Sequence, residues 1–96
     1  MLVTAFIAFQ GNTTSTQIQV QSLSEAIPSL LKRGTLNEFS RAALKPNAEP
    51  PQFSEADIVL FIPMEGLTNM WLCQIGRAGI YASIVLTVTA EKPIEI

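Results

Sequence analysis

The residues best suited to bind a ligand gather in one stretch of the chain. Four of the six basic residues, Lys32, Arg33, Arg41 and Lys45, fall within fourteen consecutive positions. Arg41 and Lys45 are four residues apart, so on a helix their side chains project together. Such a group could hold a phosphate, a carboxylate or an acidic partner. The simpler interpretation is ordinary charge on the solvent side of two helices. A small-ligand or anion-binding domain that uses this basic group therefore stands as the alternative function.

The side chains that catalyse most reactions near neutral pH are scarce. The chain has no His, which excludes Ser-His-Asp triads, Cys-His pairs and histidine zinc sites. Cys73 has no activating neighbour in the sequence and is expected to be a small core residue. Glu55 and Asp57 could share a strand face and contribute to an oxygen-only metal site, but other ligands would have to come from elsewhere. We therefore predict no catalytic residue, no metal and no cofactor, and we do not expect an enzyme.

A shortage of charge is the strongest signal in the composition. Charged residues make up 15% of the 96 residues, against about 25% in typical globular domains. The net charge of −2 gives no strong nucleic-acid or membrane signal. The length predicts a single domain over residues 1–96. A single Cys suits a reducing compartment, so a cytoplasmic protein is expected.

The segment "GIYASIVLTVTA" (79–90) lies within a run of thirteen uncharged residues. This run is too short for a membrane-spanning helix, which needs about 20 residues. Apolar side chains alternate with Tyr, Ser and Thr, which is typical of a strand with one buried face. Ile84 and Leu86 stand at the centre of the apolar set. We therefore predict a long strand with these two residues in the core.

The N-terminal segment predicts a hairpin. "LVTAFIAF" (2–9) is rich in strand-forming residues, and Gly11-Asn12 can close a tight turn before "TSTQIQVQ". With that turn, Val3 lies opposite Val20 and Ala5 opposite Ile18. The aliphatic side chains then share one face, and Gln17, Gln19 and Gln21 share the other.

The middle of the chain predicts two short helices. Pro28 favours a helix start near that residue, and Gly34 its end. The second helix is expected from Leu36 to about Leu44, before Pro46 and a stiff connection over 46–51. The apolar run 58–63 suits a central strand covered on both faces. Residues 68–75 could be strand or helix, and strand is preferred because "GRAG" (76–79) would close a hairpin.

The order is therefore strand, strand, helix, helix, strand, strand, strand. It predicts an α+β fold, with a mainly antiparallel sheet of about five strands and both helices on one face. Met1–Ser24 and Ala78–Ala90 carry no charged side chain, and strands without charge either aggregate or are covered. We predict a non-enzymatic protein that acts by association, as a homo-oligomer (dimer or higher) formed through the sheet. The edge strand 13–21 is expected to pair with its symmetry mate. The expected interface residues are Gln17, Gln19, Gln21, Tyr81 and Val85.

Overall fold

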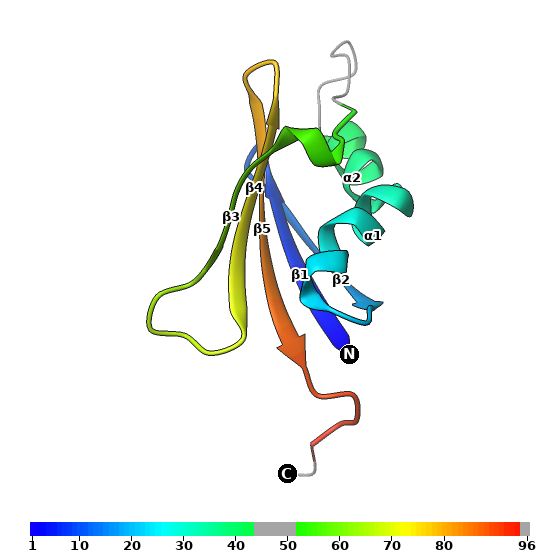
Figure 1. Ribbon diagram of the computed structural model, residues 1–96. Helices are drawn as coiled ribbons and strands as arrows, with labels where there is room; N and C mark the ends of the chain where they lie inside the picture. Colours follow the sequence, from blue (N-terminus) through cyan, green and yellow to red (C-terminus); the bar gives the residue numbers. More distant parts are fainter. Residues whose placement is uncertain (44–51, 95–96) are drawn as a thin grey trace.

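The fold is a single curved sheet with two helices packed on one face (Figure 1). The computed structural model describes residues 1–43 and 52–94. It confirms the predicted α+β class and the order of the helices and strands. Leu44, Lys45 and the predicted 46–51 connection lie outside the described residues.

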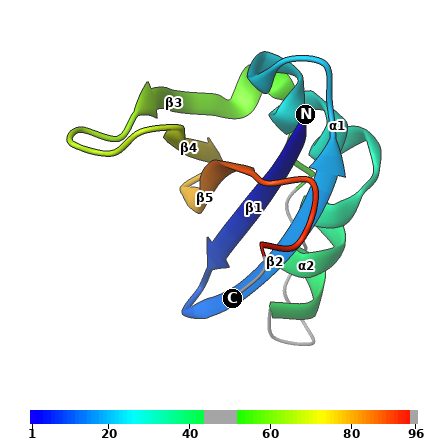
Figure 2. The ribbon, with the colours of Figure 1, turned by 90° about the horizontal axis from the view of Figure 1, so that it is seen from below.

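The five strands are all antiparallel to their neighbours. In chain order they are β1 (Leu2–Phe9), β2 (Asn12–Gln19), β3 (Ile58–Pro63), β4 (Met70–Arg77) and β5 (Ile80–Thr89). Their order in the sheet is β2-β1-β5-β4-β3, so β1 and β5 lie side by side although the rest of the chain separates them. Figure 2 shows β2 and β3 at opposite ends of the sheet.

The first hairpin has a different register from the predicted one. Its turn is Gln10-Gly11, with φ angles of 52° and 78°, and Val3 lies opposite Ile18. The tightest hairpin turn needs positive φ at both central residues, and Gly11 adopts it readily in the second position. The predicted pairing was wrong by two residues. Because two is the repeat of a strand, each side chain still lies on the predicted face.

The helices begin earlier than predicted. A 3₁₀ turn (Leu23–Glu25) leads into α1 (Ala26–Lys32), and α2 spans Thr35–Ala43. Pro28 is the third residue of α1, where its missing N–H costs no intrahelical hydrogen bond. The first helix therefore starts two residues before Pro28. Gly34, with φ of 76°, separates the helices as expected.

The core lies between the helices and the sheet. β5 has the predicted alternation, because Ala82, Ile84 and Leu86 are buried while Ser83 and Val85 are partly exposed. The helices and the segment after the undescribed residues contribute the other side of the core. Their buried apolar residues are Ala26, Ile27, Leu30, Leu36 and Phe53. The closed packing is thus confined to one face of the sheet, which we call the inner face.

Strand β3 does not lie at the centre of the sheet, so that prediction was wrong. It pairs only with β4, its register shifts between Ile58 and Leu60, and Val59 is 63% exposed. Proline is tolerated at a sheet edge, and Pro63 ends this strand. The apolar run correctly indicated a strand, but it did not indicate where in the sheet that strand lies. Residues 70–77 form a strand as preferred, and this strand supplies β3 with its only partner in the described chain.

Candidate protein-interaction surface

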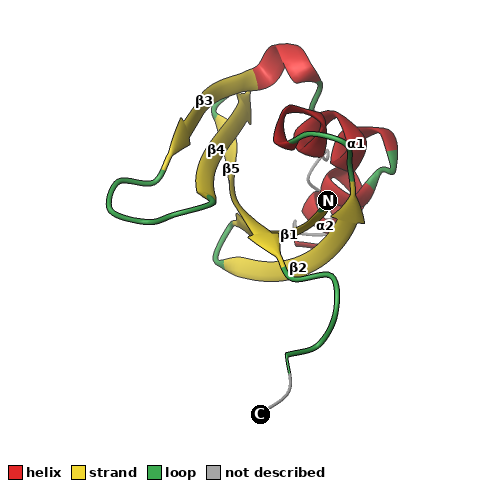
Figure 3. Ribbon diagram, turned by 60° about the horizontal axis from the view of Figure 1, so that its bottom comes forward, coloured by secondary structure: helices red, strands yellow, loops and turns green. Residues whose placement is uncertain are grey.

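The face of the sheet opposite the helices, which we call the outer face, carries no charged side chain on any of the five described strands. Cross-strand pairing defines its members. They are Leu2, Thr4, Phe6 and Ala8 of β1; Thr13, Ser15, Gln17 and Gln19 of β2; Leu60 and Ile62 of β3; Met70, Leu72, Gln74 and Gly76 of β4; and Tyr81, Ser83, Val85, Thr87 and Thr89 of β5. Figure 3 shows the helices gathered on the other side of the curved sheet.

A line of large apolar side chains crosses this face. Phe6 lies opposite Val85, Val85 opposite Leu72, and Leu72 opposite Ile62, so one side chain comes from each of β1, β5, β4 and β3. We call these four residues the apolar row. Phe6 is 49% exposed and Ile62 is 44% exposed. The row is therefore a continuous apolar stripe across an uncharged surface.

A shallow depression adjoins the apolar row. It has a volume of about 520 Å³ and lies beside Phe6 and Val85. Small side chains on either side of these two residues leave this space open. They are Ala8, Thr13, Ser15 and Ser83. The surface near Phe6 thus combines a projecting aromatic ring with a hollow.

Polar side chains near one end of the row bind one another. The Gln17 Nε2 atom donates to Thr4 Oγ1 at 3.1 Å, and the Thr4 and Thr89 hydroxyls are 2.6 Å apart. Thr89 Oγ1 also lies 3.3 Å from the carbonyl oxygen of Thr87, within hydrogen-bonding distance. A partner that covered this part of the face would not leave these side chains without hydrogen bonds.

The predicted interface residues do not form one cluster. Gln17, Gln19, Tyr81 and Val85 lie on the outer face, and Val85 belongs to the apolar row. Gln21 follows the end of β2, where its backbone N–H donates to the Glu25 carboxylate at 3.2 Å.

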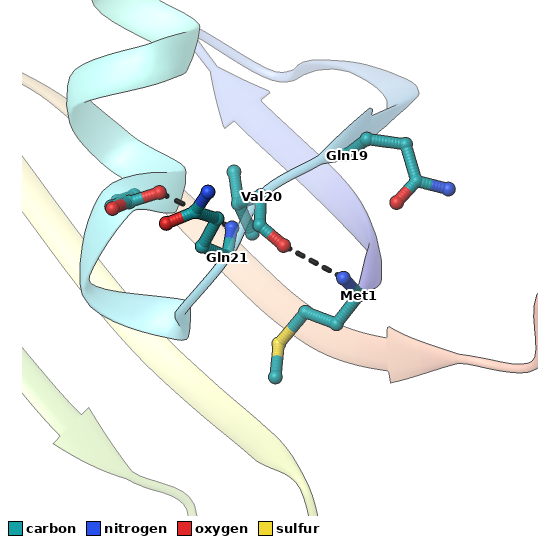
Figure 4. A pocket seen from close by; sticks show the side chains of 5 residues that line it. Met1, Gln19, Val20 and Gln21 are labelled. Atoms are coloured by element: carbon teal, nitrogen blue, oxygen red, sulfur yellow. Dashed lines mark hydrogen bonds between the residues drawn. The ribbon is translucent and has the colours of Figure 1, made fainter.

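Gln19 and Gln21 line a second hollow, of about 650 Å³, together with Met1, Val20 and Glu25. Figure 4 shows the Met1 amino group directed at the Val20 carbonyl oxygen, 2.7 Å away. The Met1 amino group and the Gln21 backbone N–H therefore already have hydrogen-bond partners within the chain.

Tyr81 has a structural role that the sequence did not indicate. It lies opposite Gly76, and a Cβ atom at position 76 would collide with the Tyr81 ring. The ring therefore covers the glycine, a device that supports strands at positions without a side chain. The ring is still 60% exposed, so Tyr81 remains part of the surface.

The basic group is partly used inside the chain. Arg33 Nη1 donates to the Gln17 carbonyl oxygen at 3.4 Å, which attaches the end of α1 to the edge strand β2. Lys32 and Arg41 are exposed, and Lys45 lies outside the described residues. Strand β2 is an edge as predicted. The strand itself carries no Lys or Pro, but Arg33 reaches this edge from the helix.

The two acidic residues considered as metal ligands and the single cysteine have contacts that stabilise the fold. Glu55 and Asp57 lie in a 3₁₀ turn (Glu55–Asp57) and not on a strand. The Asp57 carboxylate accepts the Ser54 backbone N–H at 2.8 Å and lies 3.9 Å from Arg77 Nη1. No group of three potential metal ligands occurs among the described residues. Cys73 is fully buried, and burial raises the pKa of its thiol to about 11.

Comparisons with known proteins give no match: no family model, no curated protein and no solved structure resembles this chain. In the described part of the chain, no helix combines the length and apolar character needed to cross a membrane. The surface itself must therefore support any functional argument.

Sequence reasoning missed three of the four residues in the apolar row. Phe6, Leu72 and Ile62 stand in segments where both strand parities are apolar. This signal was available, because one face of such a strand needs a cover that a single helical layer does not provide. Their alignment into a row depends on strand order and register, which the sequence did not reveal.

Proposed function

We propose that this protein acts by binding a second copy of itself through the outer face of the sheet. The observation that carries the proposal is the apolar row of Phe6, Val85, Leu72 and Ile62 on a face without charge. Contiguous exposed apolar surface marks an interaction site more often than isolated apolar residues do.

The size of the outer face suits a stable dimer. Four strand spacings of about 4.8 Å and eight residues of about 3.3 Å give roughly 500 Å² in projection, before the relief of the side chains is counted. A standard protein interface buries about 600–1,000 Å² on each partner. The projected area lies just below this range, and the relief of the side chains adds to it.

The absence of charge favours a second copy as the partner. Burying an unpaired charge is costly, and two uncharged faces can meet without that cost. A two-fold axis brings the same patch of each copy together and closes the assembly. Two sheets packed in this way lie about 10 Å apart, with their side chains interdigitated. The exposed Phe6 ring of one copy could fit into the hollow beside Phe6 and Val85 of the other copy, which is the kind of interdigitation such packing needs.

Lysine substitution tests the proposal. Val85→Lys places a charge at the centre of the face. Gln19→Lys places the same charge at the end of the edge strand β2, where a long side chain can hold its ammonium group in water. The molar mass of each variant and of the wild-type protein is measured by light scattering after size exclusion. We expect a wild-type dimer or larger oligomer, a monomeric Val85→Lys variant and an unchanged Gln19→Lys variant.

Two results contradict the proposal. A wild-type protein that stays monomeric up to high concentration would exclude self-association. An oligomer that survives Val85→Lys but is lost with Gln19→Lys would move the contact to the β2 edge. Circular dichroism of both variants checks that the fold is retained.

A further inference from the structure

The hydrogen-bonding pattern of β3 leaves the backbone N–H and C=O groups of Phe61 at the open edge. The Met64 backbone N–H donates to the Met70 carbonyl oxygen at 2.9 Å, so Ile62 and Leu60 are the β3 residues that bond to β4. In an antiparallel pair the residues between them turn their N–H and C=O groups away. Phe61 therefore presents both groups to the open edge, while Pro63 presents only a carbonyl. An incoming strand would find its first donor–acceptor pair at Phe61.

A groove runs along the inner side of this edge. Its volume is about 350 Å³, and Ser24, Ile27 and Pro28 line it from the helical side. The opposite wall consists of Glu55, Ile58 and Phe61. The Phe61 ring stacks on Trp71, with centroids 5.6 Å apart. In strand addition, the residue opposite Phe61 would direct its side chain to the same face as the Phe61 ring. That side chain would point towards the groove, whose walls favour an apolar group.

The exposed charged residues directly before and after β3 are acidic, Glu55 before the strand and Glu65 after it. Asp57 also precedes the strand, but its carboxylate is 17% exposed and lies 3.9 Å from Arg77 Nη1. Two β3 strands paired antiparallel about Phe61 would bring Glu65 of each copy towards Glu55, which precedes the strand of the other copy. Like charges opposite one another are destabilising. The edge therefore disfavours its own copy and is complementary to a strand with basic ends.

We propose that the β3 edge binds an extended segment of another protein, which adds to the sheet as a further strand. The segment would carry an apolar side chain opposite Phe61 and Lys or Arg at its flanks. Backbone hydrogen bonds at Phe61 would supply affinity, and the groove and the acidic flanks would supply selectivity. This site is at the edge of the sheet and does not depend on self-association through the outer face.

A synthetic peptide, Arg-Val-Thr-Leu-Thr-Val-Arg, tests this proposal against the full chain. Amide hydrogen exchange is followed by NMR as the peptide is added. We expect slower exchange at the Phe61 N–H, by about tenfold or more at saturation, because this amide gains a hydrogen bond on binding. The Ser15 amide is the matched control. Met1 and Val20 exchange backbone hydrogen bonds, so every second residue of β2 before Val20 bonds to β1. Ser15 lies between these residues, and its N–H therefore points to the open β2 edge.

A second experiment reverses the charges at the two ends of the peptide. A peptide with Glu in place of both Arg residues should bind about tenfold more weakly, since like charges would then meet. The exposed Glu65→Lys variant, expected to fold normally, should narrow that difference. An unchanged exchange rate at Phe61 would overturn the proposal. So would protection at Ser15 alone, or equal affinity for the two peptides.

Discussion

The two faces of the sheet differ by one residue along each strand but have different surroundings. On the inner face, Ile7, Ile84 and Cys73 form a cross-strand line that is almost completely buried. On the outer face, the neighbouring residues Phe6, Val85 and Leu72 form a parallel line that is partly or half exposed. Both lines are apolar, and only the first has helices over it.

Under the proposed self-association, this difference separates two tasks of the same sheet. Burial under the helices stabilises the monomer, because apolar surface removed from water contributes about 25 cal/mol per Å². The outer line contributes less of this stabilisation until another surface covers it. Substitutions on the two lines should therefore affect different quantities, namely the free energy of unfolding and the oligomeric state.

The largest expected effect is at the inner line. Ile84→Ala removes a fully buried side chain and should lower the free energy of unfolding by about 2–5 kcal/mol, since a cavity would remain. Thr87→Ala on the outer side of the same strand should change it by less than about 1 kcal/mol in the monomer. Chemical denaturation at low protein concentration measures both values. If Thr87→Ala proved the costlier change, the two faces would have been assigned wrongly.

A smaller effect is expected where Tyr81 covers Gly76 on the outer face. Gly76→Ala places a methyl group against the ring and should cost about 1–3 kcal/mol, as other overpacking substitutions do. In a Tyr81→Ala background the same change should cost much less, because the colliding ring is absent. A double-mutant cycle from denaturation curves measures this coupling. Equal costs in both backgrounds would show that the ring does not restrict position 76.

A third effect, confined to alkaline pH, is the pH dependence that arises from Cys73. The pKa of its buried thiol is raised from 9.0 to about 11, so the unfolded state loses its proton at lower pH than the folded state. The stability contribution is complete below pH 9 and is lost as the pH rises towards 11. Denaturation curves across this range should show a decline that Cys73→Val reduces.

Thiol reactivity provides a separate test of the same burial. At pH 8 a thiol reagent should label Cys73 only after denaturant is added, since the reactive thiolate is suppressed in the folded protein. Rapid labelling without denaturant would mean that the inner face opens more easily than its packing suggests.

The first hairpin shows how far local pattern extends. Alternation assigned Val3, Ala5 and Ile18 to the buried face, and the structure agrees although the register was wrong by two residues. The period of the strand decides the face, while the turn decides the register. The turn at Gln10-Gly11 depended on which two residues adopt positive φ, and several neighbouring polar residues were compatible with that geometry.

What the sequence determined by itself was the set of elements and their faces. The long strand with Ile84 and Leu86 inside, the two helices separated at Gly34 and the shortage of charge all follow from local spacing and composition. These properties depend on residues close together in the chain. Strand and helix periods therefore express them directly.

Only the tertiary structure decided where the strands lie relative to one another. It placed β3 at the edge, brought Arg33 to β2, and aligned Phe6 with Val85, Leu72 and Ile62. An apolar strand can lie at the centre of a sheet or at its edge, and its own residues are the same in both cases. Strand order depends on pairing between distant segments, so the candidate surface became visible only when all five strands were in place.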